Sequence, residues 1–161
     1  MAADPSIILL PCAATVLYNA IIPGTSTTGT KLDVAYLEYV NGNPIHPPEI
    51  PPTEIETYLE SLNHATDRDY LRCNILAHSV KIINDIPTLN IIIVSDNTVG
   101  NFGKPFSATA NSHIYSITLA ASQATQQEDL LFARVDYPIE TQIPKPENGG
   151  IMTTVNLQLI L

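Results

Sequence analysis

Charged side chains are scarce in this 161-residue chain: they make up 14% of it, whereas soluble domains average about a quarter. Tryptophan is absent, cysteine occurs twice, and seven basic residues stand against sixteen acidic ones. No apolar run approaches the length of about 18 residues that a membrane-spanning helix needs. The net charge of −9 disfavours direct binding of nucleic acid, because phosphate backbones are bound by basic residues. A hydrophobic share of 45% excludes a mainly disordered chain.

The charge is also unevenly distributed. Residues 1–30 contain one charged side chain, Asp4, and residues 86–127 contain two, Asp96 and Lys104. A domain of this size has too little interior to hide two such segments completely. Uncharged polar residues could solvate them, or other subunits could cover them, since interface cores are depleted of charge. Composition is compatible with both explanations.

The N-terminal segment lacks the features of an export signal. No basic residue precedes the apolar residues 7–10, Asp4 occupies that region, and Pro11 ends the run. Cys12 and Cys73 are too few for a disulfide framework, and the chain contains no Asn-x-Ser/Thr sequon. We therefore expect two buried thiols in a protein made in the cytoplasm.

Proline dominates residues 44–52, where five of the nine residues are proline. Proline lacks an amide donor and has a fixed φ, which excludes a helix or a central strand. The segment is predicted to be an extended, polyproline-like connector. The alternative is a docking segment for a neighbouring molecule, since it has little conformational entropy left to lose.

Two helix starts follow the prolines. Residues 53–56 form a capping box, and residues 66–69 place acidic side chains in the first turn of a second helix. Leu71, Ile75 and Ile82 fall on one stripe of that helix. We expect a helical hairpin over residues 53–85 that packs on a sheet.

The remaining segments favour strands. Residues 89–95 (LNIIIVS) are the most apolar β-branched run and are expected to form the central strand, buried on both faces. Residues 6–10 and 15–22 favour a strand or an extended arm. Alternating or apolar patterns predict further strands over 31–40, with both faces partly covered, over 112–120, with one buried face, and over 130–137 and 152–161.

The fold class predicted from these elements is a β-rich α+β domain over residues 1–161. It has a mixed or antiparallel, sandwich-like sheet with one helical hairpin. Residues 1–11 form an extended N-terminal arm, residues 44–52 the proline-rich connector, and residues 89–161 the main sheet.

No pattern in the chain indicates catalysis. The loop over 94–105 has Thr98 and Pro105 where a phosphate-binding loop requires Gly and Ser or Thr. Residues 24–29 are one residue too long for a nucleophile elbow. The four histidines form no HExxH motif. We predict no enzyme activity, and neither catalytic residues nor cofactor or metal ligands.

The expected function is that of a non-enzymatic structural subunit in a large homo-oligomeric assembly. In size, composition and arm-like segments the chain resembles small virion proteins of tailed bacteriophages. This resemblance implies a capsid decoration or cement protein located in the virion, with a tail tube or completion subunit as the alternative. An acidic surface is poorly suited to packing against a genome, which favours an outer position. Expected partners are copies of the chain and other subunits of the same assembly, without direct contact to nucleic acid or membrane.

Two other classes of function stay open. One is a cytoplasmic module that binds a small ligand or a partner, in which low charge reflects a binding cleft. The other is an enzyme whose site is built from scattered polar residues.

Contacts between subunits are predicted in residues 1–11 and 44–52, because both segments are nearly uncharged and stiffened by proline. Four consecutive large apolar residues, 7–10, cannot all face one core from a strand. The predicted interface residues are Ile7, Ile8, Leu9, Leu10, Pro11, Ile45, His46, Pro47, Pro48 and Ile50.

Overall fold

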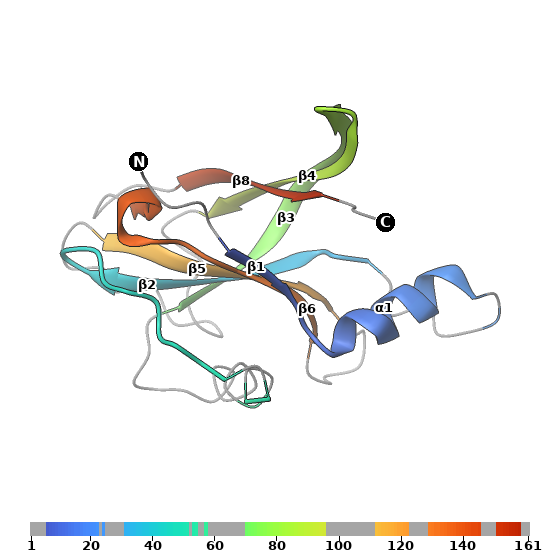
Figure 1. Cartoon of the computed structure of the whole chain (residues 1–161), viewed down its shortest axis with the longest axis horizontal. Helices are drawn as coiled ribbons and strands as arrows, with labels where there is room; N and C mark the ends of the chain where they lie inside the picture. The colour runs from blue at the N-terminus through green and yellow to red at the C-terminus, as the bar shows by residue number, and fades with distance from the viewer. Residues whose placement is uncertain are drawn as a thin grey trace.

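The computed structural model describes residues 6–22, 24, 31–51, 53–54, 57, 70–95, 112–122, 129–145 and 151–158. Within them, most residues are β-strand and one element is an α-helix (Figure 1), which confirms a β-rich α+β fold. The elements are β1 (Ser6–Leu9), α1 (Cys12–Ile21), β2 (Val34–Asn41), β3 (Tyr70–Ile83), β4 (Ile86–Ser95), β5 (Ser112–Ala121), β6 (Leu130–Asp136), the 3-10 helix η2 (Ile139–Thr141), β7 (Ile143–Lys145) and β8 (Ile151–Gln158).

The strands form two antiparallel sheets that share β3. The larger sheet has the order β1-β6-β5-β2-β3, with β7 paired to β5, and the smaller sheet has the order β3-β4-β8. The first part of β3, through Asn74, pairs with β2, and the part from Ile75 onward pairs with β4. A register irregularity between Ile75 and Ala77 lies next to this change of partner. Such irregularities bend a strand, which lets β3 pass from one sheet to the other.

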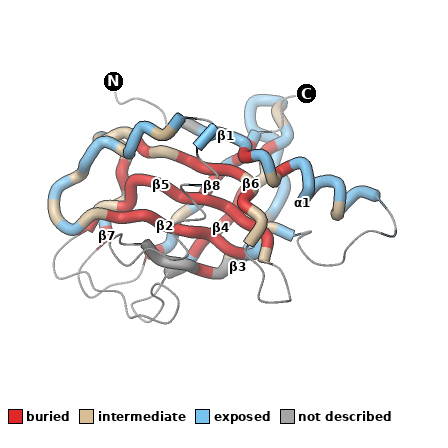
Figure 2. The backbone as a smooth tube through the Cα atoms, turned by 90° about the horizontal axis from the view of Figure 1, so that it is seen from below, coloured by how far each residue is buried: buried red, intermediate tan, exposed pale blue. Residues whose placement is uncertain are grey.

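One core cluster takes buried side chains from both sheets. The larger sheet contributes residues such as Leu37 and Ile117, and the smaller contributes Ile91, Ile93 and Val155. A second cluster, Leu10, Val34, Tyr36, Ala120 and Leu131, lies on the opposite face of the larger sheet. Both faces of that sheet are therefore covered at its centre, where β2, β5 and β6 are buried (Figure 2). The sandwich-like packing of the sheets stays a prediction.

The strands predicted over 31–40, 112–120, 130–137 and 152–161 are confirmed as β2, β5, β6 and β8, with slightly different ends. The predicted burial of β2 on both faces is also confirmed. β5 differs from the prediction, because its burial extends to both faces. Its neighbours β2 and β6 hold it inside the larger sheet, between the two core clusters.

The predicted helical hairpin over 53–85 is wrong in its second half. Residues 70–83 form β3, which is hydrogen-bonded to β2 and β4. Positions 71 and 75 are four residues apart and share a face in a strand as well as in a helix, so this spacing did not distinguish the two. The first predicted helix falls mostly outside the described residues. Of its start, residues 53–54 form a turn in which the amide of Glu54 donates to the carbonyl of Pro51 over 2.8 Å.

The N-terminal segment also departs from the expected extended arm. Residues 6–9 pair with β6 as an edge strand of the chain's own sheet. Residues 12–21 form a helix, although Thr15 and Val16 suggested a strand. Pro11, with a φ of −54°, precedes it in a conformation suited to a helix start. Ala13 and Val16, three residues apart, form its buried face.

The strand expected at the centre lies beside the edge. β4 is flanked by β3 and by the edge strand β8, whereas β2 occupies the middle of the strand order. Ile91 and Ile93 are buried, but Val94 is 39% exposed, so the predicted burial of this run on both faces is wrong. Ile75 lies beside Ile93 in the neighbouring strand and does not cover it from a helix.

Candidate functional site

A network of charged side chains is buried on the face of the larger sheet that carries the second core cluster. The guanidinium of Arg134 donates through Nη1 to Glu38 Oε2 over 2.5 Å and through Nε to Asp136 Oδ1 over 2.9 Å. Arg134 and Glu38 are each 1% exposed. The Ser116 hydroxyl donates to the same oxygen of Asp136. These residues come from β2, β5 and β6, and one guanidinium forms ion pairs with two carboxylates.

Strand register brings the network together. Glu38 lies opposite Ser116, Ser116 lies opposite Asp136, and directly opposed residues share a face of the sheet. Thr118 lies opposite Arg134 on the next rung, and its buried hydroxyl has no hydrogen-bond partner in the part of the chain that the structure describes. At the edge of the cluster the Tyr36 hydroxyl donates to Asp129. The sequence carries no signal for this site, because Glu38 and Arg134 are separated by 96 residues.

The proline-rich segment contacts the domain from which it comes. A cavity of about 460 Å³ lies between residues 47–51 and Asp136. Ile50 packs against the second core cluster, and the side-chain amide of Gln142 donates to the carbonyl of Ile45. The segment is therefore held at several points on the chain itself, and its role as an extended connector or docking segment stays a prediction.

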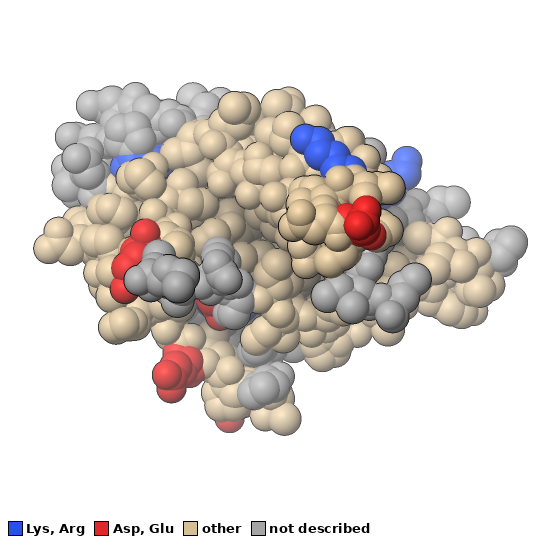
Figure 3. Space-filling view, turned by 45° about the horizontal axis from the view of Figure 1, so that its top comes forward, with Lys and Arg blue, Asp and Glu red and all other residues tan. Residues whose placement is uncertain are grey.

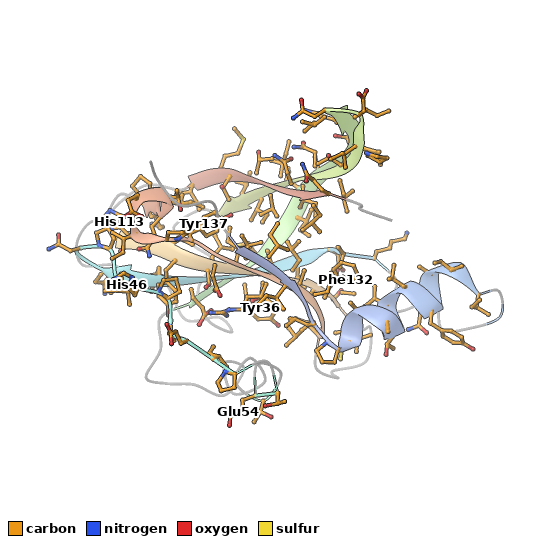
Figure 4. All side chains as sticks on the ribbon, in the orientation of Figure 1. Tyr36, His46, Glu54, His113, Phe132 and Tyr137 are labelled. Carbon is orange, nitrogen blue, oxygen red and sulfur yellow. The ribbon has the colours of Figure 1, made fainter. Side chains whose placement is uncertain are left out.

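The arrangement favours a structural role for the charged network. The Ser116 hydroxyl donates to a carboxylate, and Nδ1 of His113 lies 2.6 Å from the carbonyl oxygen of Gly42. In Figure 4, Glu54 lies well apart from His46 and His113, so these groups do not form an acid–base pair. Among the described residues, no group of three or more His, Cys, Asp or Glu is placed to hold a metal ion.

Within the described ranges, two ionisable groups have shifted pKa values because they are buried. Burial raises the pKa of Tyr137 to about 12. Burial lowers the pKa of Lys145, which lies on β7 and is fully buried. Both shifts follow from loss of solvation of the charged form.

The structure distributes the predicted interface residues between surface and core. Leu10 is buried in the second core cluster, and Ile50 is half-buried and packs against it. Pro47 is half-buried beside the cavity. The exposed members of the set are Ile7, Ile8, Leu9, Pro11, Ile45, His46 and Pro48. For these residues, contact with another subunit stays a prediction.

Sequence reasoning missed two exposed apolar surfaces. On α1, which extends beyond the sheet in Figures 1 and 2, Leu17, Tyr18 and Ile21 point to solvent. The hairpin of β3 and β4 exposes Val80 and Ile82. Charged groups are few on the face shown in Figure 3. The helical spacing of the apolar residues over 14–21 could have indicated the first surface, but this segment was predicted to be a strand or an extended arm.

Both cysteines are thiols: Cys73 on β3 is buried, as predicted, whereas Cys12 on α1 is only half-buried. No described helix combines the length and the apolar character needed to cross a membrane.

Comparisons of the chain with protein-family models, with curated proteins and with solved structures found no match.

Proposed function

We propose that this protein is a non-enzymatic structural subunit of a homo-oligomeric assembly. The observation that carries the proposal is the exposed apolar stripe of α1, formed by Ala14, Leu17, Tyr18 and Ile21. Positions spaced by three and four residues lie on one helix face, so these side chains form one continuous surface. Contiguous apolar surface of this kind marks an interaction site more often than single exposed residues do.

The charge distribution supports copies of the same chain as partners. Residues 12–21 contain no charged side chain, although the chain carries a net charge of −9. Two such helices can meet without like-charge repulsion, whereas most other pairings of an acidic chain with itself would bring carboxylates together. On β1, the exposed side chains of Ile7 and Leu9 are also uncharged.

The place that we propose for the subunit is the outside of a bacteriophage virion, as a capsid decoration protein. The acidic balance supports an outer position, because surfaces that face a packaged genome are normally basic. A tail tube subunit is the alternative within such a particle, since an acidic lumen would repel DNA.

The native mass of the full chain tests the proposal. We expect sedimentation velocity at micromolar concentration to show species well above the 17.5 kDa of one chain. Ile21→Lys should shift the distribution toward the monomer, because a charge would then lie in the apolar stripe. Met152→Lys is the matched control, since it adds the same charge to an exposed apolar position on β8 rather than on α1. A parent protein that stays monomeric throughout would overturn the proposal.

The cavity beside Asp136 favours a second candidate, a module that binds a small ligand. At about 460 Å³ the cavity lies within the usual range of ligand sites. This function would be favoured over the first if the native chain is monomeric and if Asp136→Asn loses the affinity for a small ligand that the parent chain shows.

A further inference from the structure

The β3–β4 hairpin projects from the body of the domain (Figure 1) and ends in a tight turn. Its turn residues, Asn84 and Asp85, have φ values of 52° and 63°. Two consecutive residues with positive φ match the turn that fits the natural twist of a hairpin, and Asn and Asp tolerate this conformation. The tip is thus a defined structure in which Asp85 is exposed.

One face of the hairpin continues the face that forms the core. Val80 lies opposite Leu89 and Ile82 lies opposite Pro87, and these alternate pairs share a side of the hairpin with Ile91. Ile91 at the base is buried in the core, whereas Val80 is 68% and Ile82 is 73% exposed farther out. The apolar face therefore extends beyond the part of the domain that covers it.

A cavity opens at the base of this face. Its volume is about 380 Å³, and the described residues that line it are Lys31, Leu32, Leu89 and Ile91. Three of these are apolar, and Lys31 is exposed. The cavity offers room for large apolar side chains next to a positive charge.

We propose that the hairpins of two copies of this chain pack face to face around a two-fold axis, so that each tip covers the cavity of the other copy. This inference rests on the proposed function and names one interface of the assembly. Four residues separate Pro87 near the tip from Ile91 at the cavity, which is about 14 Å along a strand. A two-fold axis that passes between the two hairpins at the Val80–Leu89 pair brings Pro87 of each copy opposite Ile91 of the other. It places Ile82 of each copy over the partner's cavity and Asp85 near the partner's Lys31.

Charge complementarity favours a second copy of the chain as the partner that covers the apolar hairpin face and the cavity. The tip carries an acidic residue and the cavity carries a basic one, so the surface is complementary to itself in sign, as a two-fold interface requires. Lys81, a second charged residue of this hairpin, lies opposite Thr88 on the other face and stays outside the contact. A ligand confined to the cavity would leave Val80 and Ile82 in water.

Charge reversal in the full chain tests the contact. We expect Lys31→Glu and Asp85→Lys each to weaken self-association about tenfold in sedimentation velocity, and the double variant to return to within about threefold of the parent. Asp85→Asn removes the charge but keeps a residue suited to the turn, and it should also weaken association. Lys81→Glu, the control on the opposite face, should behave as the parent does.

A cysteine at the proposed axis gives an independent readout. Val80→Cys should form a covalent dimer under mild oxidation, because the two copies of residue 80 would be adjacent. Lys81→Cys should show only the background given by Cys12 and Cys73. If the parent assembles but the charge variants and Val80→Cys match it, the hairpin contact is wrong while the proposed function stands. A monomeric parent would overturn both.

Discussion

The buried ion pair gives the sharpest prediction about stability. Arg134→Met keeps an unbranched side chain of similar length and removes the guanidinium that binds Glu38 and Asp136. Glu38, whose side chain is 2% exposed, would then be a buried charge without its cation. Removal of one partner from a buried pair costs about 3–5 kcal/mol. This is a large part of the 5–15 kcal/mol by which a typical domain is stable.

The network predicts unequal effects for its two ends. Glu38→Leu leaves Arg134 bound to Asp136 through Nε, so the guanidinium keeps a counter-charge. We therefore expect Glu38→Leu to destabilise the fold less than Arg134→Met does. The double variant should be more stable than Arg134→Met alone, because it also removes the buried carboxylate that has lost the Arg134 guanidinium.

Urea unfolding followed by circular dichroism measures all three variants. The free energies of unfolding, taken at neutral pH and compared in a double-mutant cycle, report the coupling between positions 38 and 134. Equal losses for the two single variants would contradict the counter-charge that Asp136 provides to Arg134. A double variant whose loss is the sum of the two single losses would show that positions 38 and 134 are not coupled.

Three further predictions concern pH, the core and the cysteines. Burial raises the pKa of Tyr137 to about 12 from 10.0, so between these pH values the folded chain holds a proton that the unfolded chain loses. The free energy of unfolding should therefore fall as the pH rises through this window, by at most about 2–3 kcal/mol. Tyr137→Phe should lose less stability over that window in urea unfolding, and an unchanged pH profile would contradict the assignment. Ile93→Ala should cost about 2–5 kcal/mol and the half-exposed Val94→Ala below about 1 kcal/mol, measured the same way; similar losses would mean that β4 is covered on both faces. A thiol reagent added to the unfolded protein without reductant should titrate both Cys12 and Cys73, and finding neither would indicate a disulfide.

Local patterns in the sequence were sufficient for several strands. β2 was predicted from the apolar run over 31–40 and from the Asn-Gly turn that follows it, and Gly42 in that turn has a φ of 89°. β8 was predicted from strict alternation, which its burial pattern repeats. Such signals depend on neighbours within a few residues, so they do not require knowledge of the rest of the fold.

The error over residues 70–83 shows where local patterns fail. A spacing of four residues places side chains on one face in a helix and in a strand alike. Tertiary pairing decided between them, because β2 and β4 offer hydrogen-bond partners along the length of β3. At residues 12–21 the opposite happened, since β-branched residues suggested a strand and α1 formed. Intrinsic preferences of this size are easily overridden by packing.

The sequence by itself therefore determined the β-rich class, the scarcity of charge and the apolar strands, all of which are properties of composition or of short segments. Only the tertiary structure decided which charges are buried and which apolar residues are exposed. Glu38 and Arg134 meet because antiparallel register aligns three strands from distant parts of the chain. Ile82 is exposed although it belongs to an apolar run, because the hairpin carries it beyond the sheet that covers Ile91. Burial depends on what lies opposite in space, and a residue's neighbours in sequence do not specify that.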